Sequence, residues 1–424
     1  MTTAALTSHE AADIAAERDA DDPLAVYRDR FVINDEKLIY LDGNSLGRLP
    51  RSAAADIHRA VTTEWGDALI TGWDRWMDLG RQVGDLLAGP VLDAEPGEVV
   101  LSDSTSVNLY KLASAALSAR PDRRVVIVDE DNFPTDQYVL QSLAAERGLT
   151  LRPVCADIDA GLDTAQVVAA LDTDVALVVL SHVAYRSGAI ADLTEITRRA
   201  HEVGAMVLWD LCHSAGSVPV PLRAAGADLA VGCGYKYLNG GPGAPAFLYV
   251  RRDLQTRLRQ PIAGWFGQTD QFEMGGGYEP VAGINRFLVG TPPVLAQYGA
   301  LAGVQIAAEA GIDAVRTKSI ALTTYAVELF DAWLAGHGFR LASPRDPDRR
   351  GGHVTLYHPQ AWQICQAWKD DKVLPDFRTP DRLRIGMAPL YTRFGDVCEA
   401  FLRLRRIMVT GAYHDYPTAR PRVT

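Results

Sequence analysis

Residues 206–243 read MVLWDLCHSAGSVPVPLRAAGADLAVGCGYKYLNGGPG, and this stretch decides the fold. Its two apolar runs, 206–209 and 229–233, have the length and composition of buried parallel strands. Asp210 follows the first run directly, and Lys236 follows the second after a short gap. In open α/β sheets, ligands bind beyond the carboxyl ends of the strands, so both charged side chains are expected at one crevice.

An acid and a lysine that converge on one crevice suit pyridoxal 5′-phosphate (PLP) as a cofactor. The lysine amine can bind its aldehyde covalently, and the carboxylate can keep its pyridine nitrogen protonated, so that the ring accepts electrons. The alternative interpretation makes Asp210 a strand-end cap and Lys236 a surface lysine. Two flanking tyrosines and a following Gly/Pro-rich turn favour an ordered lysine instead. The spacing from Asp210 to Lys236 resembles that of fold-type I PLP enzymes, the aminotransferase-like superfamily.

Length and composition fit a folded enzyme with two domains. The chain has 424 residues, 48% of them hydrophobic and 22% charged, enough for a sizeable core. Its formal net charge of -11 argues against a nucleic-acid or anionic-membrane partner. No apolar run approaches the roughly 18 residues of a membrane span, and the N-terminus does not resemble a signal peptide. The five cysteines lack metal-ligand spacing, which predicts reduced thiols, no metal and a cytoplasmic location.

Strand and helix patterns alternate between residues 150 and 210, which predicts right-handed βαβ units in a mostly parallel sheet. We therefore predict an α/β, fold-type I PLP-dependent transferase-like architecture, in which a large domain with that sheet carries a small C-terminal α+β domain. One helical run is expected from 295 to about 335, linking to the small domain, and the loop 343–352 is expected to be solvated and mobile. The predicted divisions are 1–40 (an N-terminal segment packing with the small domain), 41–300 (the large PLP-binding domain) and 301–424 (the linking helix and small domain).

Residues 40–47 read YLDGNSLG, a polar turn that follows a short strand. The string closely resembles the opening motif of the kynureninases, PLP-dependent hydrolases that cleave kynurenine to anthranilate and alanine. Seven such motifs between Tyr40 and about Asp396 resemble this family, and the chain is identified as a member of its bacterial type. The resemblance implies a hydrolase that cleaves the Cβ–Cγ bond of L-kynurenine, and also of 3-hydroxykynurenine, in tryptophan catabolism.

Two of these motifs concern the cofactor. Hydroxyl residues precede an apolar periodic run at 102–117, which predicts a helix N-terminus, a place that attracts anions. In the resembling family this loop holds the cofactor phosphate, and the aromatic residue of a Phe-Pro-Thr-Asp motif stacks on the pyridine ring. The resemblance implies these cofactor-binding residues: Thr105, Ser106, Phe133, Pro134, Thr135, Asp136, Ser181, Asp210, His213, Tyr235, Lys236, Trp265 and Thr291.

Another motif concerns the substrate. Arg384 matches the arginine that binds the α-carboxylate in fold-type I enzymes, and a planar guanidinium suits a bidentate carboxylate pair. The substrate-binding residues implied by the resemblance are Arg384, Trp73, Gly290 and Ser45. Family forms that prefer 3-hydroxykynurenine tend to carry His and Asn at the positions of Trp73 and Thr291. This sequence lacks both, which implies that kynurenine is the better substrate.

The resemblance also implies catalytic roles and a partner. Lys236 is expected to take the Cα proton, Asp210 to sustain the electron sink, and Tyr235 to contact the phosphate and relay a proton. Trp265 and Thr291 lie on Gly/Pro-rich loops that reach the neighbouring subunit in fold-type I dimers. A homodimer with shared active sites is therefore expected.

Two alternatives remain open at this point. A cysteine desulfurase of the same fold needs a cysteine in a small-domain loop, whereas Cys365 and Cys398 lie on predicted helices. A relative that had lost catalysis would not need an intact Lys236 and Asp210, and covalently bound cofactor would distinguish it from an enzyme.

Overall fold

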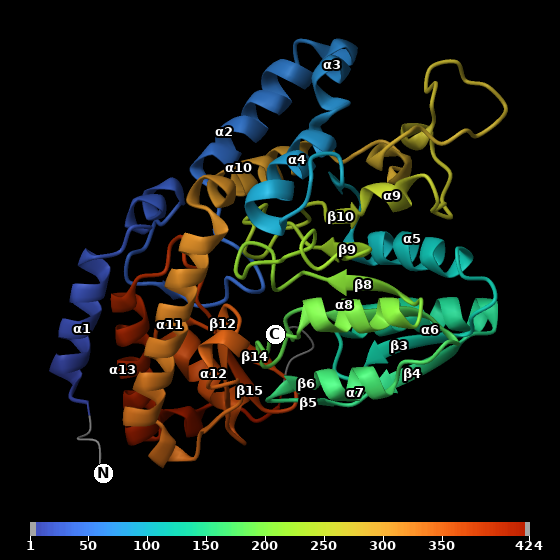
Figure 1. The fold of residues 1–424 in the computed structure, drawn as a ribbon. Helices are drawn as coiled ribbons and strands as arrows, with labels where there is room; N and C mark the ends of the chain where they lie inside the picture. Colours follow the sequence, from blue (N-terminus) through green and yellow to red (C-terminus); the bar gives the residue numbers. More distant parts are fainter. Residues whose placement is uncertain (1–5, 420–424) are drawn as a thin grey trace.

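A seven-stranded sheet forms the centre of the larger part of the protein (Figure 1). The computed structural model describes residues 6–419, so the first and last five residues of the predicted terminal segments lie outside it. The strands are β2 (Val99–Leu101), β3 (Val125–Asp129), β4 (Thr150–Val154), β7 (Val175–Ser181), β8 (Met206–Asp210), β9 (Leu229–Gly232) and β10 (Phe247–Val250). Their order is β2-β10-β9-β8-β7-β3-β4; neighbours from β9 to β4 pair in parallel, and β10 pairs antiparallel with β9 and β2.

Helices cover both faces of this sheet, because alternate residues of each strand point to opposite sides. Val207 and Trp209 of β8 pack into one buried cluster, while Met206 and Leu208 pack into the other. The first cluster contains residues of α4 (Leu79–Leu92), α7 (Thr164–Ala169), α8 (Leu193–Glu202) and α10 (Val294–Ala310), and the second those of α5 (Thr105–Ser118) and α6 (Pro134–Arg147). The predicted mostly parallel sheet with helices on its faces is confirmed.

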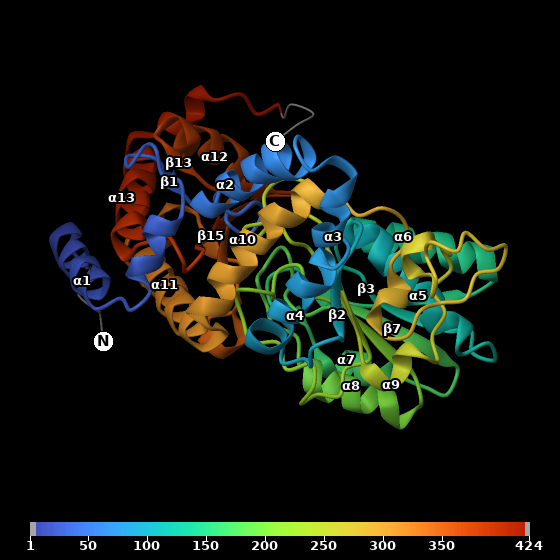
Figure 2. The same ribbon diagram turned by 90° about the horizontal axis from the view of Figure 1, so that it is seen from above.

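A second, smaller part carries a four-stranded antiparallel sheet in the order β11-β12-β15-β14. Its strands are β11 (Arg340–Leu341), β12 (His353–Tyr357), β14 (Asp376–Arg378) and β15 (Arg382–Gly386). Its helices are α11 (Ile312–Trp333), α12 (Ala361–Asp370) and α13 (Phe394–Thr410). Helix α1 (Ser8–Ala20) lies against this part in both views (Figures 1 and 2), and Tyr325 Oη donates to Ala11 O at 2.7 Å. The boundaries at 40/41 and 300/301 stay predictions.

The remaining helices and strands are short. They are β1 (Ile39–Tyr40), α2 (Arg51–Arg59), α3 (Trp73–Trp76), the hairpin strands β5 (Ala156–Asp157) and β6 (Gly161–Leu162), α9 (Arg252–Gln255) and β13 (Val373–Leu374). Strand β1 pairs in parallel with β13 of the small part. Among the described residues, no helix is long and apolar enough to cross a membrane.

Residues 42–47, which follow β1, form a loop that bridges the two parts. Asp42 forms a β-bridge with Gly386 at the end of β15. At the other end of the loop, Gly47 N donates to Tyr235 O at 2.8 Å. A Cβ atom added to Gly47 would collide with Asn239 and with the carbonyl of Lys236. The loop is therefore pinned between the small sheet and the segment that carries Lys236.

Two expectations for the small part were wrong. The helical run from 295 to 335 is broken at Gly311, where φ of +75° favours glycine over residues with a side chain. The loop 343–352 is not simply solvated, because the Arg350 side chain is 1% exposed. Its guanidinium donates to the carbonyl oxygens of Pro344 at 2.8 Å and Arg345 at 2.7 Å, so main-chain acceptors compensate its burial.

Candidate active site

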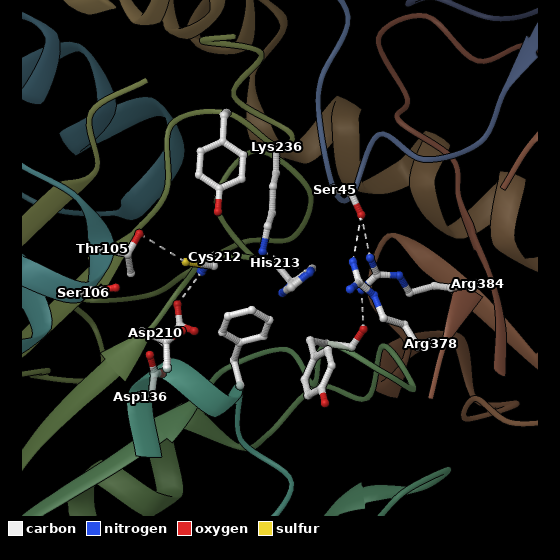
Figure 3. A pocket seen from close by; sticks show the side chains of 14 residues that line it. Ser45, Thr105, Ser106, Asp136, Asp210, Cys212, His213, Lys236, Arg378 and Arg384 are labelled. Carbon is white, nitrogen blue, oxygen red and sulfur yellow. Dashed lines mark hydrogen bonds between the residues drawn. The ribbon is translucent and has the colours of Figure 1, made fainter. Parts of the chain in front are cut away.

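A pocket of about 270 Å³ opens beyond the carboxyl end of β8, between the two parts (Figure 3). Most of the predicted site residues line it, although they come from distant segments. The lining residues are Ser45, Thr105, Ser106, Phe133, Thr135, Asp136, Tyr185, Asp210, Cys212, His213, Tyr235, Lys236, Arg378 and Arg384. The crevice expected from residues 206–243 is present.

Asp210, the last residue of β8, is fixed in place by hydrogen bonds. Its Oδ1 accepts from Cys212 N at 2.8 Å, and its Oδ2 lies 3.4 Å from Ser181 Oγ at the end of β7. Ser181 Oγ also lies 2.8 Å from Asn132 Oδ1. Ser181 therefore contacts the Asp210 carboxylate and helps to orient it, but does not line the pocket.

A second carboxylate lies beside Asp210: it belongs to Asp136, in the first turn of α6. Its side chain is buried, and its Oδ2 has no hydrogen-bond partner among the described residues. Burial, and next the nearby Asp210 carboxylate, hold the pKa of Asp136 well above its usual range. Two adjacent buried carboxylates favour a proton or a cation between them. The protonated pyridine nitrogen of PLP meets this need, so this end of the pocket fits the cofactor.

Lys236 reaches into the pocket from the loop after β9. Its Nζ lies 3.2 Å from His213 Nε2 and 6.0 Å from the centre of the Phe133 ring. Burial, and next the charge of Lys236, hold the pKa of His213 well below its usual range, so the imidazole is neutral and accepts from the lysine. Asn239 N donates to Lys236 O at 2.9 Å, which orders the turn as its Gly/Pro-rich sequence predicts.

The N-terminus of α5 forms the third side of the pocket. Ser104 caps this helix, because its Oγ accepts from Val107 N at 3.4 Å. Thr105 and Ser106 follow in the first turn and line the pocket. Their hydroxyls and the helix dipole suit a phosphate group.

Arg384 of β15 lies at the opposite end, and its side chain is 1% exposed. Its guanidinium donates to Tyr185 O at 2.6 Å and to Ser45 Oγ at 2.7 Å, and pairs with Asp376 at 2.5 Å. Arg378 also donates to Ser45 Oγ, at 3.2 Å, so two guanidinium groups converge on one hydroxyl (Figure 3). This end of the pocket fits a carboxylate.

Six predicted residues do not line this pocket within one chain: Ser181, described above, and five others. Trp73 packs against Trp76 and Phe266, with ring centres 5.4 Å and 6.1 Å away. Gly290 and Thr291 line a separate small cavity, and Trp265 is 37% exposed. Pro134 lies at the start of α6, where its ring suits a first helical position.

The sequence analysis missed three residues that line the pocket: Tyr185, Cys212 and Arg378. Arg378 lies on β14, which pairs antiparallel with β15 so that Asp376 is opposite Arg384. A predicted antiparallel pairing of the strands around Arg378 and Arg384 would have suggested that Arg378 lies near the pocket. In the described part of the chain, no group of three or more His, Cys, Asp or Glu side chains could hold a metal ion.

Comparisons with known proteins agree with this geometry. Residues 315–404 match the family model of the kynureninase C-terminal domain. The kynureninase of Pseudomonas fluorescens is 43% identical over 398 residues, which cover 92% of this chain and 94% of that protein. The kynureninase of Burkholderia pseudomallei (strain K96243) is 43% identical over 403 residues, covering 93% of this chain and 95% of that protein.

Two solved structures show the fold. A cysteine desulfurase from Thermococcus onnurineus NA1 superposes with a TM-score of 0.78 at 19% identity, covering 91% of this chain and 98% of that one. A C-DES mutant with glycine covalently linked to its PLP cofactor superposes with a TM-score of 0.77 at 20% identity, covering 89% and 98%. The predicted fold-type I architecture is confirmed.

Proposed function

Because this chain belongs to the kynureninase family, as its motifs predicted, we propose that the pocket binds PLP and hydrolyses the Cβ–Cγ bond of L-kynurenine to anthranilate and L-alanine. The enzyme acts in tryptophan catabolism, and 3-hydroxykynurenine is a second substrate. One observation carries the proposal: a lysine amine, a pair of buried carboxylates, a helix N-terminus and a buried arginine surround a single pocket.

The residues would hold PLP as follows. Thr105, Ser106 and the N-terminus of α5 would bind the phosphate, and Asp210 with Asp136 would hold the protonated pyridine nitrogen. Phe133 would contact the ring, and Lys236 would bind the aldehyde. Bound in this way, PLP supplies an electron sink for the bonds to the substrate Cα.

Two side chains are placed to move protons. The Lys236 amine, once released by the incoming substrate amine, takes the Cα proton, and neutral His213 at 3.2 Å holds it in position. Burial raises the pKa of Tyr235, so its hydroxyl stays protonated at neutral pH and can donate. Arg384 and Ser45 would fix the substrate carboxylate and so orient the substrate in the pocket.

Purified protein should release anthranilate from L-kynurenine, which fluorescence detects directly. The activity should depend on PLP and reappear when cofactor is added back to the apoenzyme. Absence of anthranilate release from PLP-saturated protein would refute the proposal. A desulfurase role has no support, since Cys365 and Cys398 are buried in α12 and α13. A cytoplasmic location and the absence of a nucleic-acid partner stay predictions.

We also propose a homodimer in which Trp265 and Thr291 complete the partner's site. What supports this is that both residues lie on the segment 263–293 and that neither lines the pocket of its own chain. Large apolar side chains of the same region are exposed, among them Phe272 and Met274 at 73% and 76%. Such side chains are typical of a surface that another chain covers.

Mixing two inactive variants tests the shared sites. A Lys236→Ala chain and a Trp265→Ala/Thr291→Ala chain should each have little activity, whereas a mixture should regain up to about a quarter of the wild-type rate. In a mixed dimer, one of the two sites receives Lys236 from the loop variant and both loop residues from the Lys236→Ala chain. The control is Lys236→Ala alone, treated in the same way and at the same total protein concentration as the mixture. If subunit exchange is demonstrated and activity does not return, the sites are not shared.

The aryl pocket should favour kynurenine. Trp73 and Thr291 do not line the pocket of their own chain, and in the proposed dimer they would offer it a flat apolar wall with one N–H donor and a hydroxyl. No side chain is then dedicated to an extra ring hydroxyl. A site of this kind discriminates weakly, and we expect a kcat/KM preference for kynurenine of about tenfold. Trp73→His with Thr291→Asn should narrow or reverse it, as steady-state kinetics on both substrates would show. A wild-type preference for 3-hydroxykynurenine would contradict the proposed role of Trp73 and Thr291 in specificity. It would leave the assignment to the kynureninase family unchanged.

A further inference from the structure

We propose that a second cavity, outside the active site, binds a compact oxyanion between Arg259 and Arg286. The cavity has a volume of about 150 Å³. Its lining residues are Arg259, Gln260, Ala263, Tyr278, Pro280 and Arg286. None of them was singled out by the sequence, and none lines the PLP pocket.

Arg286 is the central observation. Its side chain is only 9% exposed, yet its guanidinium makes no hydrogen bond or ion pair with any residue that the structure describes. Burial, and also the like charge of Arg259, lower the pKa of Arg286. The cavity thus brings two cations together without an acid to neutralise them.

Other buried cations among the described residues have partners: main-chain carbonyl oxygens accept from Arg350, and carboxylates pair with the rest. Lys111 lies 2.6 Å from Asp103, Lys318 lies 2.6 Å from Asp22, and Arg382 lies 2.6 Å from Asp159. Burying a charge without a partner is costly, so such a group is expected to have a counter-ion. Arg286 lacks one among residues 6–419, and we infer that its partner comes from outside this part of the chain.

The lining defines the chemistry of that partner. Two guanidinium groups suit the oxygens of a carboxylate or a phosphate. The remaining polar groups are already engaged: Tyr278 Oη donates to Gly267 O at 3.3 Å, and Ile262 N donates to Gln260 Oε1 at 2.9 Å. The arginines therefore supply the attraction, and the volume admits only a small group.

The oxyanion has a structural consequence. Arg259 precedes and Arg286 follows the long excursion that extends beyond α9, drawn in yellow in Figure 1. An anion held by both side chains would clamp the two ends of this excursion, which carries Trp265. Free phosphate and a carboxylate of a second copy of this chain offer the same chemistry, and the experiment separates them.

Inorganic phosphate is the probe, titrated calorimetrically into holoenzyme whose PLP has been fixed to the protein by borohydride, so that the cofactor phosphate site is filled. Wild type should bind one phosphate per chain. Arg286→Gln and Arg259→Gln should each weaken this binding at least tenfold. Arg257→Gln, an exposed arginine outside the cavity, should bind as wild type. The exposed Arg259 keeps the test valid if Arg286→Gln fails to fold.

If the oxyanion is instead a carboxylate of a second copy, phosphate binds no more tightly to wild type than to the variants. Arg286→Gln and Arg259→Gln then raise the dissociation constant between chains at least tenfold by analytical ultracentrifugation, and Arg257→Gln leaves it unchanged. The proposal is overturned if wild type shows no phosphate binding and the variants leave self-association unaltered.

Discussion

Lys236→Ala is expected to abolish covalent attachment of PLP and to lower kynurenine turnover by at least about a thousandfold. The change removes both the amine that binds the aldehyde and the base that takes the Cα proton. No other lysine lines the pocket, within the residues described, so no second amine can take over. Anthranilate fluorescence measures the turnover, and absorbance after borohydride treatment and gel filtration measures attached cofactor.

Lys236→Arg is the matched control. It keeps a positive charge near His213 but forms no comparable bond to an aldehyde. It therefore distinguishes the effect of the charge from the effect of the covalent bond and of the base. Both variants should lose attached cofactor and turnover to a similar extent. Retention of a tenth of the wild-type rate in either variant would show that Lys236 is not the catalytic base.

Arg384→Lys is expected to raise KM for kynurenine about a hundredfold with a smaller effect on kcat, because hydrogen bonds to charged groups contribute about 1.5–3 kcal/mol each. Lysine keeps the charge opposite Asp376 but loses the planar pair of donors. Alanine is a poorer choice, since removing one partner of a buried ion pair costs about 3–5 kcal/mol of folding stability.

Kynuramine, which lacks the carboxylate, provides the control for that variant. Its binding, followed by the change in cofactor absorbance, should differ little between wild type and Arg384→Lys. Equal loss of affinity for kynurenine and kynuramine would mean that Arg384 shapes the pocket without contacting the carboxylate. Melting temperatures of the two proteins would reveal a general loss of stability.

The parts of the site that sequence could predict depend on short-range pattern. Asp210 and Lys236 follow apolar runs whose length identifies buried parallel strands, and parallel strands bring their carboxyl ends to one edge. The hydroxyls at 104–106 precede an apolar periodic run, which locates a helix N-terminus. In each case, local order along the chain determines where the side chain points.

The parts that could not be predicted depend on contacts between distant segments. Arg378 joins the pocket through the register of β14 against β15, and register is set by the packed sheet rather than by either strand. The burial of Arg350 depends on carbonyl oxygens turned toward it by its own loop, which composition does not reveal. For Trp265 and Thr291, a single chain cannot supply the answer, since their proposed target belongs to another copy.

The pinned loop 42–47 restricts how this active site can evolve. Gly47 lies so close to Asn239 and to the Lys236 carbonyl that even alanine would collide, and Gly386 is crowded by the Asn44 side chain. At Gly47, two main-chain segments are thus in direct contact. Natural variants can change specificity through side chains such as Ser45 that project from the loop. Single substitutions in this loop cannot widen the contact without a collision. The distance between Lys236 and the end of the pocket that holds Arg384 is therefore difficult to change one mutation at a time.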